Sequence, residues 1–209
     1  MAVYHDARCR LCRRSGMKLF LKGSRCFTDK CAIERRGYAP GEHGKSRRVK
    51  ETNYGQQLRE KQKTRQIYGL LERQFRHYFS KASEAKGVTG EVLLQMLERR
   101  LDNVLYRVNF ALSRSQSRQV VRHGHVTVNG RSVDIPSFLV KPGDTVAIRE
   151  KSRKMATILT TIEARKGQSA PEWLDVDTDK LSAKVLSIPT RDSIPIPINE
   201  QLIVELYSK

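Results

Sequence analysis

Four cysteines near the start of the chain are the residues that most clearly indicate a functional site, because cysteines grouped in this way can bind a metal ion. They follow the pattern C-x2-C-x13-C-x4-C within 23 residues, at positions Cys9, Cys12, Cys26 and Cys31. Thiolates paired at such short spacing are typical ligands of a tetrahedral zinc ion. Basic neighbours such as Arg8 and Arg25 favour the thiolate form that binds metal. The pattern therefore predicts a structural Zn²⁺ site with these four ligands.

Other interpretations of the cysteines stay open. Four thiolates also suit an iron–sulfur cluster, which is the remaining metal alternative. The residues could instead be free buried thiols, or Cys9 and Cys12 could form a redox pair. The redox interpretation is weak because no βαβ pattern surrounds that pair.

A glycine-rich loop follows at residues 39–46, with the sequence APGEHGKS. It ends in the Gly-Lys-Ser of nucleotide-binding loops, but the strict pattern needs glycine at the position of Ala39. Such a loop also joins a buried strand to a helix, and neither flank has that character. We therefore interpret the loop and the basic residues after it as a grip on an RNA backbone, through Arg47, Arg48 and Lys50.

Basic and polar side chains recur at helical spacing on two consecutive predicted helices. The first stripe is formed by Arg100, Asn103 and Arg107, and the second by Arg114, Arg118 and Arg122. A charge run is usually an ordinary solvated face, yet two stripes joined by a polar corner favour a groove for a phosphate backbone. The other predicted RNA contacts are Arg59, Lys61, Ser113, His123 and Asn129.

No pattern of catalytic residues stands out. The five histidines form no HExxH array, and no Ser/His/Asp order or carboxylate pair has catalytic spacing. The sequence therefore predicts a binding protein rather than an enzyme.

Hydrophobic periodicity predicts the helices and strands that carry the candidate binding residues. Apolar side chains recur every three or four residues in two long helices, and Ser113 with Gln116 forms a capping box at the start of a shorter one. Asn129 and Gly130, between two β-rich runs, are a strong hairpin signal. The expected order is helices at 54–81, 91–109 and 113–123, strands at 126–128, 131–133 and 145–149, a helix at 153–166 and an apolar tail at 202–207.

The net charge points to a polyanionic partner. The 209 residues include 40 Lys and Arg against 22 Asp and Glu, for a net charge of +18. Such a charge opposes folding unless a polyanion neutralises it, so nucleic acid is the first candidate and an anionic membrane surface the second. No apolar run is long enough to span a membrane and no secretory signal is apparent, so we expect a cytoplasmic protein with reduced cysteines.

One stretch of the chain resembles the small αL RNA-binding domain. The resemblance lies in RLDNVLYR at 100–107, SRSQSRQVV at 113–121, GHVTVNG at 124–130 and PGD at 142–144. This module occurs in several classes of RNA-binding protein, so alone it implies only that the chain binds structured RNA.

The flanking segments narrow the resemblance to the bacterial small-subunit ribosomal protein four family. They are PGEHG at 40–44, YGQQLREKQ at 54–62, LERQF at 71–75 and INEQLIVELYSK at 198–209. The four-cysteine start is similar to the zinc-carrying branch of this family. Other members lack those cysteines, so the zinc prediction depends on the cysteines of this chain.

The resemblance implies an α+β protein in which an αL domain, with two helices and a short antiparallel sheet, is inserted into a mainly helical domain. Residues 1–50 hold 14 basic and 4 acidic residues and are too polar to fold on hydrophobicity alone. We expect them to form a basic N-terminal extension stapled by zinc. The helical domain is then expected at 51–90 and 153–209, and the αL domain at 91–152.

The resemblance also implies a function and partners. Such proteins bind 16S ribosomal RNA directly and early, and they nucleate assembly of the 5′ domain and body of the 30S small ribosomal subunit. They line the channel through which mRNA enters, contact small-subunit proteins five and three, and influence translational accuracy. The implied protein acts in the ribosome and has no membrane partner.

Three other classes are alternatives. An RNA-modifying enzyme would need a separate catalytic domain, for which the Pro-broken segment after Glu150 leaves no room. A transient assembly or rescue factor and a zinc-dependent DNA regulator would both carry a basic surface, but the flanking motifs favour a resident ribosomal protein.

Overall fold

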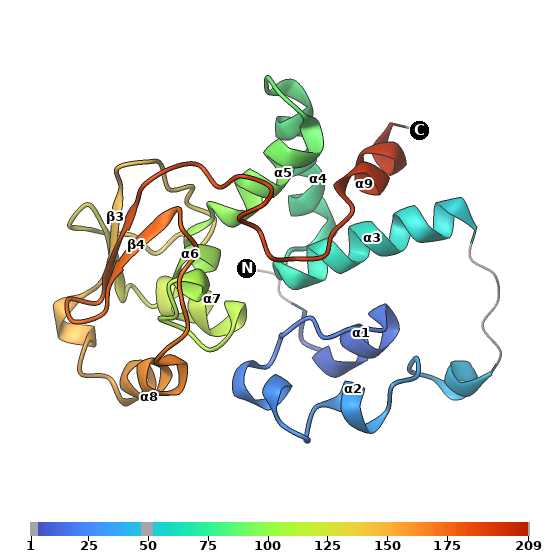
Figure 1. The fold of residues 1–209 in the computed structure, drawn as a ribbon, viewed down its shortest axis with the longest axis horizontal. Coiled ribbons are helices and arrows are strands. Elements are labelled where there is room, and N and C mark those ends of the chain that lie inside the picture. Colours follow the sequence, from blue (N-terminus) through green and yellow to red (C-terminus); the bar gives the residue numbers. More distant parts are fainter. Residues whose placement is uncertain (1–3, 47–51, 209) are drawn as a thin grey trace. The chain divides into compact units, whose positions relative to one another are not determined.

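The computed structural model describes residues 4–46 and 52–208, and it combines helices with a β-sheet, which confirms the α+β prediction (Figure 1). The chain divides into two compact units. Unit 1 comprises Met1–Leu93 and Ile196–Lys209, and unit 2 comprises Leu94–Pro195. The middle of the chain therefore forms one unit, while its two ends form the other.

Short helices build the N-terminal segment of unit 1, where the sequence predicts irregular structure. They are α1 (Arg8–Ser15), the 3-10 turn η1 (Gly23–Phe27), α2 (Ala32–Arg35) and the 3-10 turn η2 (Glu42–Lys45). The Arg13 side chain ties the glycine-rich loop to α1. It donates from Nε to the Tyr38 carbonyl at 3.0 Å and from Nη2 to the Ala39 carbonyl at 3.2 Å. No strand of the described residues leads into this loop, so its surroundings differ from those of a nucleotide-binding loop.

Two longer helices, α3 (Asn53–Ile67) and α4 (Glu72–Glu84), follow in unit 1, where the sequence predicts one helix over 54–81. The start of α5 (Thr89–Glu98) also belongs to unit 1. The single predicted helix is divided because Gly69, with φ of +65°, turns the chain between α3 and α4. Thr52 caps α3, since its hydroxyl accepts from the Gly55 amide at 3.1 Å.

The C-terminal helix α9 (Glu200–Tyr207) returns to unit 1 and packs on α3. Its Ile203 side chain is fully buried, as the apolar tail predicts. The Tyr207 ring stacks on Phe79 with ring centroids 4.3 Å apart, and its hydroxyl donates to Glu72 Oε1 at 3.1 Å. Lys61 Nζ lies 2.5 Å from the same carboxylate oxygen. An aromatic stack and a shared carboxylate therefore hold α3, α4 and α9 together.

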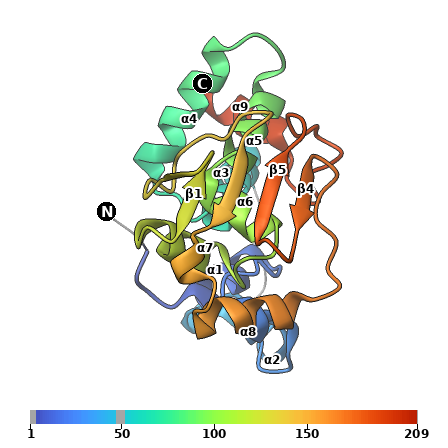
Figure 2. The same cartoon turned by 90° about the vertical axis from the view of Figure 1, so that its left-hand side faces the viewer.

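Unit 2 contains a five-stranded antiparallel sheet in the order β2-β1-β3-β5-β4 (Figure 2). The strands are β1 (Val126–Val128), β2 (Arg131–Ser132), β3 (Thr145–Ile148), β4 (Leu174–Asp177) and β5 (Ser182–Val185). The predicted hairpin is confirmed, because Asn129 and Gly130 have φ of +50° and +78° between β1 and β2.

The strands β4 and β5 correct the predicted domain boundary. Residues 153–195 were expected in the C-terminal part of the helical domain, yet they belong to unit 2. The reason is packing: Trp173, Leu181 and Val185 join the same buried cluster as the β1 and β3 residues. Of the predicted segment 153–209, the part that belongs to unit 1 begins at Ile196.

The helices of unit 2 differ from the predicted ones at one position. They are the end of α5, α6 (Leu101–Arg107), α7 (Arg114–Arg122) and α8 (Ala156–Arg165), with the 3-10 turn η3 (Glu150–Ser152) before α8. The predicted helix at 91–109 is broken at Arg100, whose extended backbone forms a bridge with Leu139. The predicted cap of α7 is confirmed, because Ser113 Oγ accepts from the Gln116 amide at 3.3 Å.

Glu72 links the stability of unit 1 to pH. Burial by itself would raise its pKa, but the hydrogen bond and charge of Lys61, with the Tyr207 hydroxyl, hold that pKa below its ordinary value. The stabilisation is therefore present above the ordinary carboxyl pKa and is lost as the pH falls through the lowered value. We expect Glu72→Gln to be less stable than the wild type at neutral pH and to lose less stability on acidification to about pH 3.

Urea unfolding at several pH values measures this difference. Glu91→Gln, at an exposed position on α5, is the matched control and should follow the wild-type curve. An equal acid-induced loss of stability in Glu72→Gln and the wild type would show that this carboxylate does not contribute.

Candidate nucleic-acid interface and cysteine cluster

A buried ion pair lies at the start of α6, between its N-cap residue Arg100 and Asp102 in its first turn. Arg100 donates to Asp102 twice, from Nε to Oδ1 at 3.0 Å and from Nη2 to Oδ2 at 2.6 Å. The two residues are 1% and 4% exposed. Arg118 of α7 approaches the same carboxylate, with Nη1 3.4 Å from Asp102 Oδ2. Asp102 thus connects two of the predicted RNA-binding arginines inside unit 2.

A second buried carboxylate, that of Glu98, connects Asn103 and Arg107 of the first stripe with Arg114 of the second. Glu98, which is 1% exposed, accepts from Arg107 Nε at 2.8 Å and Nη2 at 2.6 Å, and from Asn103 Nδ2 at 2.8 Å. Asn103 Oδ1 in turn accepts from Arg114 Nε at 2.8 Å. The stripe at 100, 103 and 107 is therefore part of an internal network rather than an open groove.

This network corrects the predicted contact set. Arg100 and Asn103 are buried, so they cannot meet an RNA backbone in this conformation. Lys61 is also buried and pairs with Glu72, as described above. Ser113 is buried at the start of α7, where its hydroxyl serves as the helix cap. Asn103 and Arg107 do share one side of α6, where both bind the buried Glu98. Arg100 lies in the break before that helix, so the helical spacing does not apply to it.

Of the remaining predicted RNA contacts, three are half-buried, and the others are exposed or lie outside the described residues. The half-buried ones are Arg107, Arg114 and Arg118, each bound within the network. Asn129 is exposed, but its amide bridges two turns: Nδ2 donates to Asp144 Oδ1 at 2.8 Å and Oδ1 accepts from the Thr145 amide at 2.9 Å. Arg47, Arg48 and Lys50 lie outside the described residues.

Three further predicted contacts are exposed: Arg59 on α3, Arg122 at the end of α7, and His123 directly after it. The His123 ring meets the His125 ring edge-on, with centroids 6.0 Å apart. The His125 carbonyl accepts from the Arg149 amide at 2.9 Å, and His125 Nδ1 lies 2.9 Å from Ser152 Oγ. The end of α7 is therefore adjacent to the segment at 149–152.

We call the exposed basic residues of this neighbourhood the His123 patch: Arg122, His123, Arg149 and Lys151. Sequence reasoning missed the last two because they follow a strand rather than lying on a helix. The register of β1 with β3, which pairs Val126 with Ile148, places them beside α7. The hairpin and strand signals were visible in the sequence, but they did not specify that register.

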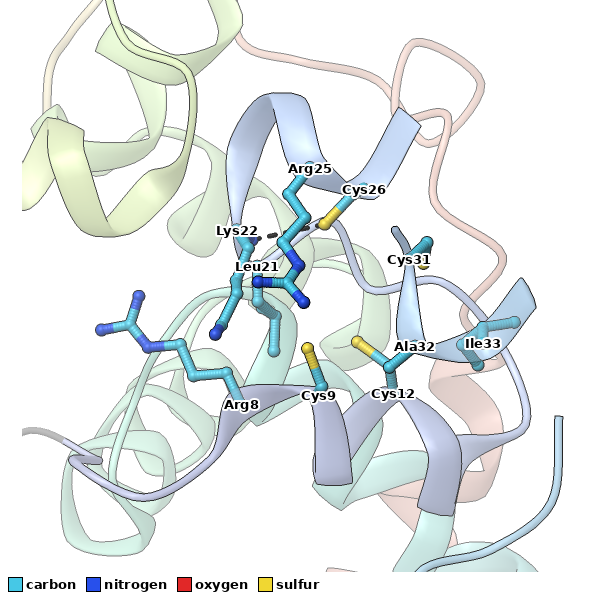
Figure 3. A pocket seen from close by; sticks show the side chains of 10 residues that line it. All are labelled: Arg8, Cys9, Cys12, Leu21, Lys22, Arg25, Cys26, Cys31, Ala32 and Ile33. Atoms are coloured by element: carbon cyan, nitrogen blue, oxygen red, sulfur yellow. Dashed lines mark hydrogen bonds between the residues drawn. The ribbon is translucent and has the colours of Figure 1, made fainter. Parts of the chain in front are cut away.

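The four cysteines line one small pocket in the N-terminal segment (Figure 3). Cys9 and Cys12 come from α1, Cys26 from η1, and Cys31 from the start of α2, and none is in a disulfide. The pocket has a volume of about 10 Å³, which is roughly the space of one water-sized sphere. Its wall also carries the cationic residues Arg8, Lys22 and Arg25. The spacing thus predicted correctly that the four thiols share one site.

The pocket is not assembled as a metal site. Within residues 4–46 and 52–208, no group of three His, Cys, Asp or Glu side chains is arranged so that it could hold a metal ion as it stands. Burial raises the pKa of the Cys12 thiol, a hydrogen bond with the Leu19 backbone opposes that rise, and the other three cysteines add to it. The donor set suits zinc by its chemistry, because four thiolates are a usual structural set for that ion.

Among the described helices, none is long and apolar enough to cross a membrane.

Two protein families match consecutive parts of the chain. Residues 3–98 match the Ribosomal protein S4/S9 N-terminal domain, and residues 99–146 match the S4 domain. The second match begins beside Arg100 and reaches into β3, so it contains α6, α7 and the hairpin.

Relatives match along the whole chain. The small ribosomal subunit protein uS4 of Acidobacterium capsulatum is 60% identical, that of Acetivibrio thermocellus 58%, and that of Thermoanaerobacter pseudethanolicus 57%. In each comparison the alignment covers 209 residues, which is 100% of this chain and 100% of the relative.

Because Arg100 neutralises the buried Asp102, we expect it to contribute to the stability of the fold. Arg100→Ala would leave Asp102 buried with only the longer contact to Arg118, so we expect it to lower the free energy of unfolding by about 3 kcal/mol. Arg122→Ala, at an exposed position, should change stability by less than about 0.5 kcal/mol. Urea unfolding of both variants tests this contrast, and an Arg100→Ala variant as stable as Arg122→Ala would contradict the role given to the pair.

Proposed function

The chain belongs to the family of small ribosomal subunit protein uS4, and on that premise we propose that it binds 16S ribosomal RNA through the exposed basic residues of both units. It is a structural component of the small ribosomal subunit and not an enzyme. The observation that carries the RNA contact in unit 2 is the His123 patch, whose four side chains are exposed and whose two segments are joined by the hydrogen bond from the Arg149 amide to the His125 carbonyl. Phosphate oxygens are the natural ligands of such a surface.

The proposed mechanism is electrostatic and geometric. Exposed Arg and Lys side chains replace counterions on converging phosphates. Helical RNA hides the base edges of its major groove, so the readout is mostly of shape and of 2′-hydroxyl groups. The arginines bound to Glu98 and Asp102 act indirectly, because they keep α6 and α7 in place behind the patch.

The finer roles are proposals that rest on the family resemblance. We infer that the protein binds early, nucleates assembly of the 5′ domain and body of the 30S subunit, and later lines the channel through which mRNA enters. In the mature particle it contacts small-subunit proteins five and three and influences translational accuracy. The exposed cations of the N-terminal segment, where most of the net charge resides, support contact with RNA there as well.

We also propose that Cys9, Cys12, Cys26 and Cys31 hold one structural Zn²⁺ ion. The support is the convergence of four thiols on one pocket whose wall carries cationic side chains. When bound, the metal would cross-link α1, η1 and α2, which bury too little apolar surface to hold one another firmly. The four thiols would have to close around the ion, since the described residues do not form a closed ligand set.

The RNA contact predicts a dependence on salt. Binding of the protein to 16S ribosomal RNA should weaken steeply as the salt concentration rises, because each phosphate contact releases counterions. Lys151→Ala should weaken binding and reduce the slope of log K against log salt by about one unit. Lys184→Ala, which removes an exposed lysine from β5, is the matched control and should leave both quantities unchanged. Filter binding over a salt series measures the slope, and a flat salt dependence would refute the phosphate mechanism.

The zinc proposal predicts about one zinc ion per chain in the purified protein. Cys26→Ala should lose the metal, because Cys26 is one of the four ligands, whereas His43→Ala in the same segment should retain it. Elemental analysis measures the metal, and a visible absorption spectrum tests for the iron–sulfur alternative. A wild-type protein purified without a near-stoichiometric metal, or one that contains iron and sulfide, would overturn the proposal.

A further inference from the structure

An aromatic pair stands exposed on the N-terminal segment. The rings of Phe20 and Phe27 stack with their centroids 5.1 Å apart and their planes 29° from parallel. Phe20 is 36% exposed and Phe27 is 62% exposed. Much of the Phe27 ring therefore faces solvent, which is unfavourable for so large an apolar side chain in the absence of a partner.

The backbone holds this pair in place at a conformational cost. Phe20 has φ of +52°, in the left-handed region that bulky residues rarely adopt. Strain of this kind persists only where the surroundings enforce it, and it is concentrated at functional sites. Here the neighbouring Leu19 is 2% exposed, so the chain anchors Leu19 inward while the Phe20 ring stays at the surface.

The cysteine pocket borders this part of the chain, since Leu21 and Lys22 line its wall. The Lys22 amide, two residues after Phe20, donates to Cys26 Sγ at 3.4 Å (Figure 3). This bond anchors the chain on the C-terminal side of Phe20. Phe27 follows Cys26 directly, at the end of η1. Both rings are therefore close in sequence to residues that the cysteine pocket and the buried Leu19 hold in place.

The charges around the pair indicate the kind of partner. Lys22, Arg25 and Lys30 are exposed within a few residues of the rings, and Arg25 Nε donates to the Lys30 carbonyl at 3.3 Å. Of the two carboxylates nearby, Glu34 is paired with Lys18 at 2.7 Å and Asp29 is exposed. An apolar ring face bordered by cations is complementary to a nucleic-acid base with its phosphates, and it is a poor match for a basic or purely apolar protein surface.

We propose that Phe20 and Phe27 form a stacking platform for an unpaired base of RNA. The inference rests on the proposed RNA-binding function and adds a second kind of contact to it. The base stacks on the exposed face of Phe27, Phe20 supports that ring from behind, and Lys22 and Arg25 bind the flanking phosphates. Every base has a π face, so the platform accepts any base and selects unpaired nucleotides over double helix.

Substitutions of Phe27 that either remove or keep the aromatic ring test the proposal in the full-length protein. Phe27→Leu keeps an apolar side chain but removes the π face, whereas Phe27→Tyr keeps the face. We expect Phe27→Leu to bind 16S ribosomal RNA on the order of 10-fold more weakly than the wild type, and Phe27→Tyr to bind within about twofold of it. The salt slope should stay at its wild-type value in both variants, because no charge is removed.

Two controls keep the interpretation of this experiment clear. Val88→Ala removes an equally exposed apolar side chain elsewhere in unit 1 and should bind as the wild type does. Far-ultraviolet circular dichroism and metal content should be unchanged in Phe27→Leu, which excludes loss of the local fold.

The possible results distinguish this proposal from the proposed function. If the wild type binds RNA and Phe27→Leu binds equally well, the stacking platform is wrong while the RNA-binding function stands. If Phe27→Leu binds naked RNA normally but fails to join particles reconstituted with the other small-subunit proteins, the partner is a protein and the platform is again wrong. If the wild type itself does not bind the RNA, the proposed function fails first.

Discussion

The ion pairs that Glu98 and Asp102 make with arginines hold the end of α5, α6 and α7 together in unit 2. Both carboxylates are almost fully buried, and a buried charge is tolerated only when a partner of opposite charge neutralises it. Asp102 binds Arg100 and Arg118, while Glu98 binds Arg107. These contacts connect α5, α6 and α7. The position of the exposed end of α7, and with it the His123 patch, follows from this internal arrangement.

The same pairing divides the basic residues into two groups. Arginines that face the buried carboxylates are neutralised within the fold and contribute stability. Cations on the ends of α7 and η3, and along the N-terminal segment, remain at the surface, where their charge is available to a polyanion. A net charge of +18 therefore does not mean that every basic stripe is a contact surface. The exposed cations attract the polyanion, whereas the buried arginines fix the positions of the helices that carry those cations.

The N-terminal segment follows a different principle, because it has little apolar surface to bury. Its helices are short, and the residues that hold it together are few: the cysteines around one pocket, Leu19, and Arg13 bound to the carbonyls of the glycine-rich loop. The Lys22 amide hydrogen bond to Cys26 Sγ fixes the chain just after Phe20, and the buried Leu19 side chain anchors it just before. A segment built in this way can expose aromatic rings and cations together, since so few of its side chains are needed for a core.

Reading the residues alone was enough to predict the fold class, the family, the convergence of the four cysteines, the cap of α7 and the turn at Asn129 and Gly130. These depend on local spacing and local backbone conformation, which neighbouring residues dictate. The burial of Arg100 and Asn103 against carboxylates became clear only in the folded chain, because helical periodicity identifies a shared face but not what covers it. The fold also places β4 and β5 in unit 2 and Arg149 beside α7. Those outcomes depend on which distant strands pair, and short strands carry too little pattern to specify their partners.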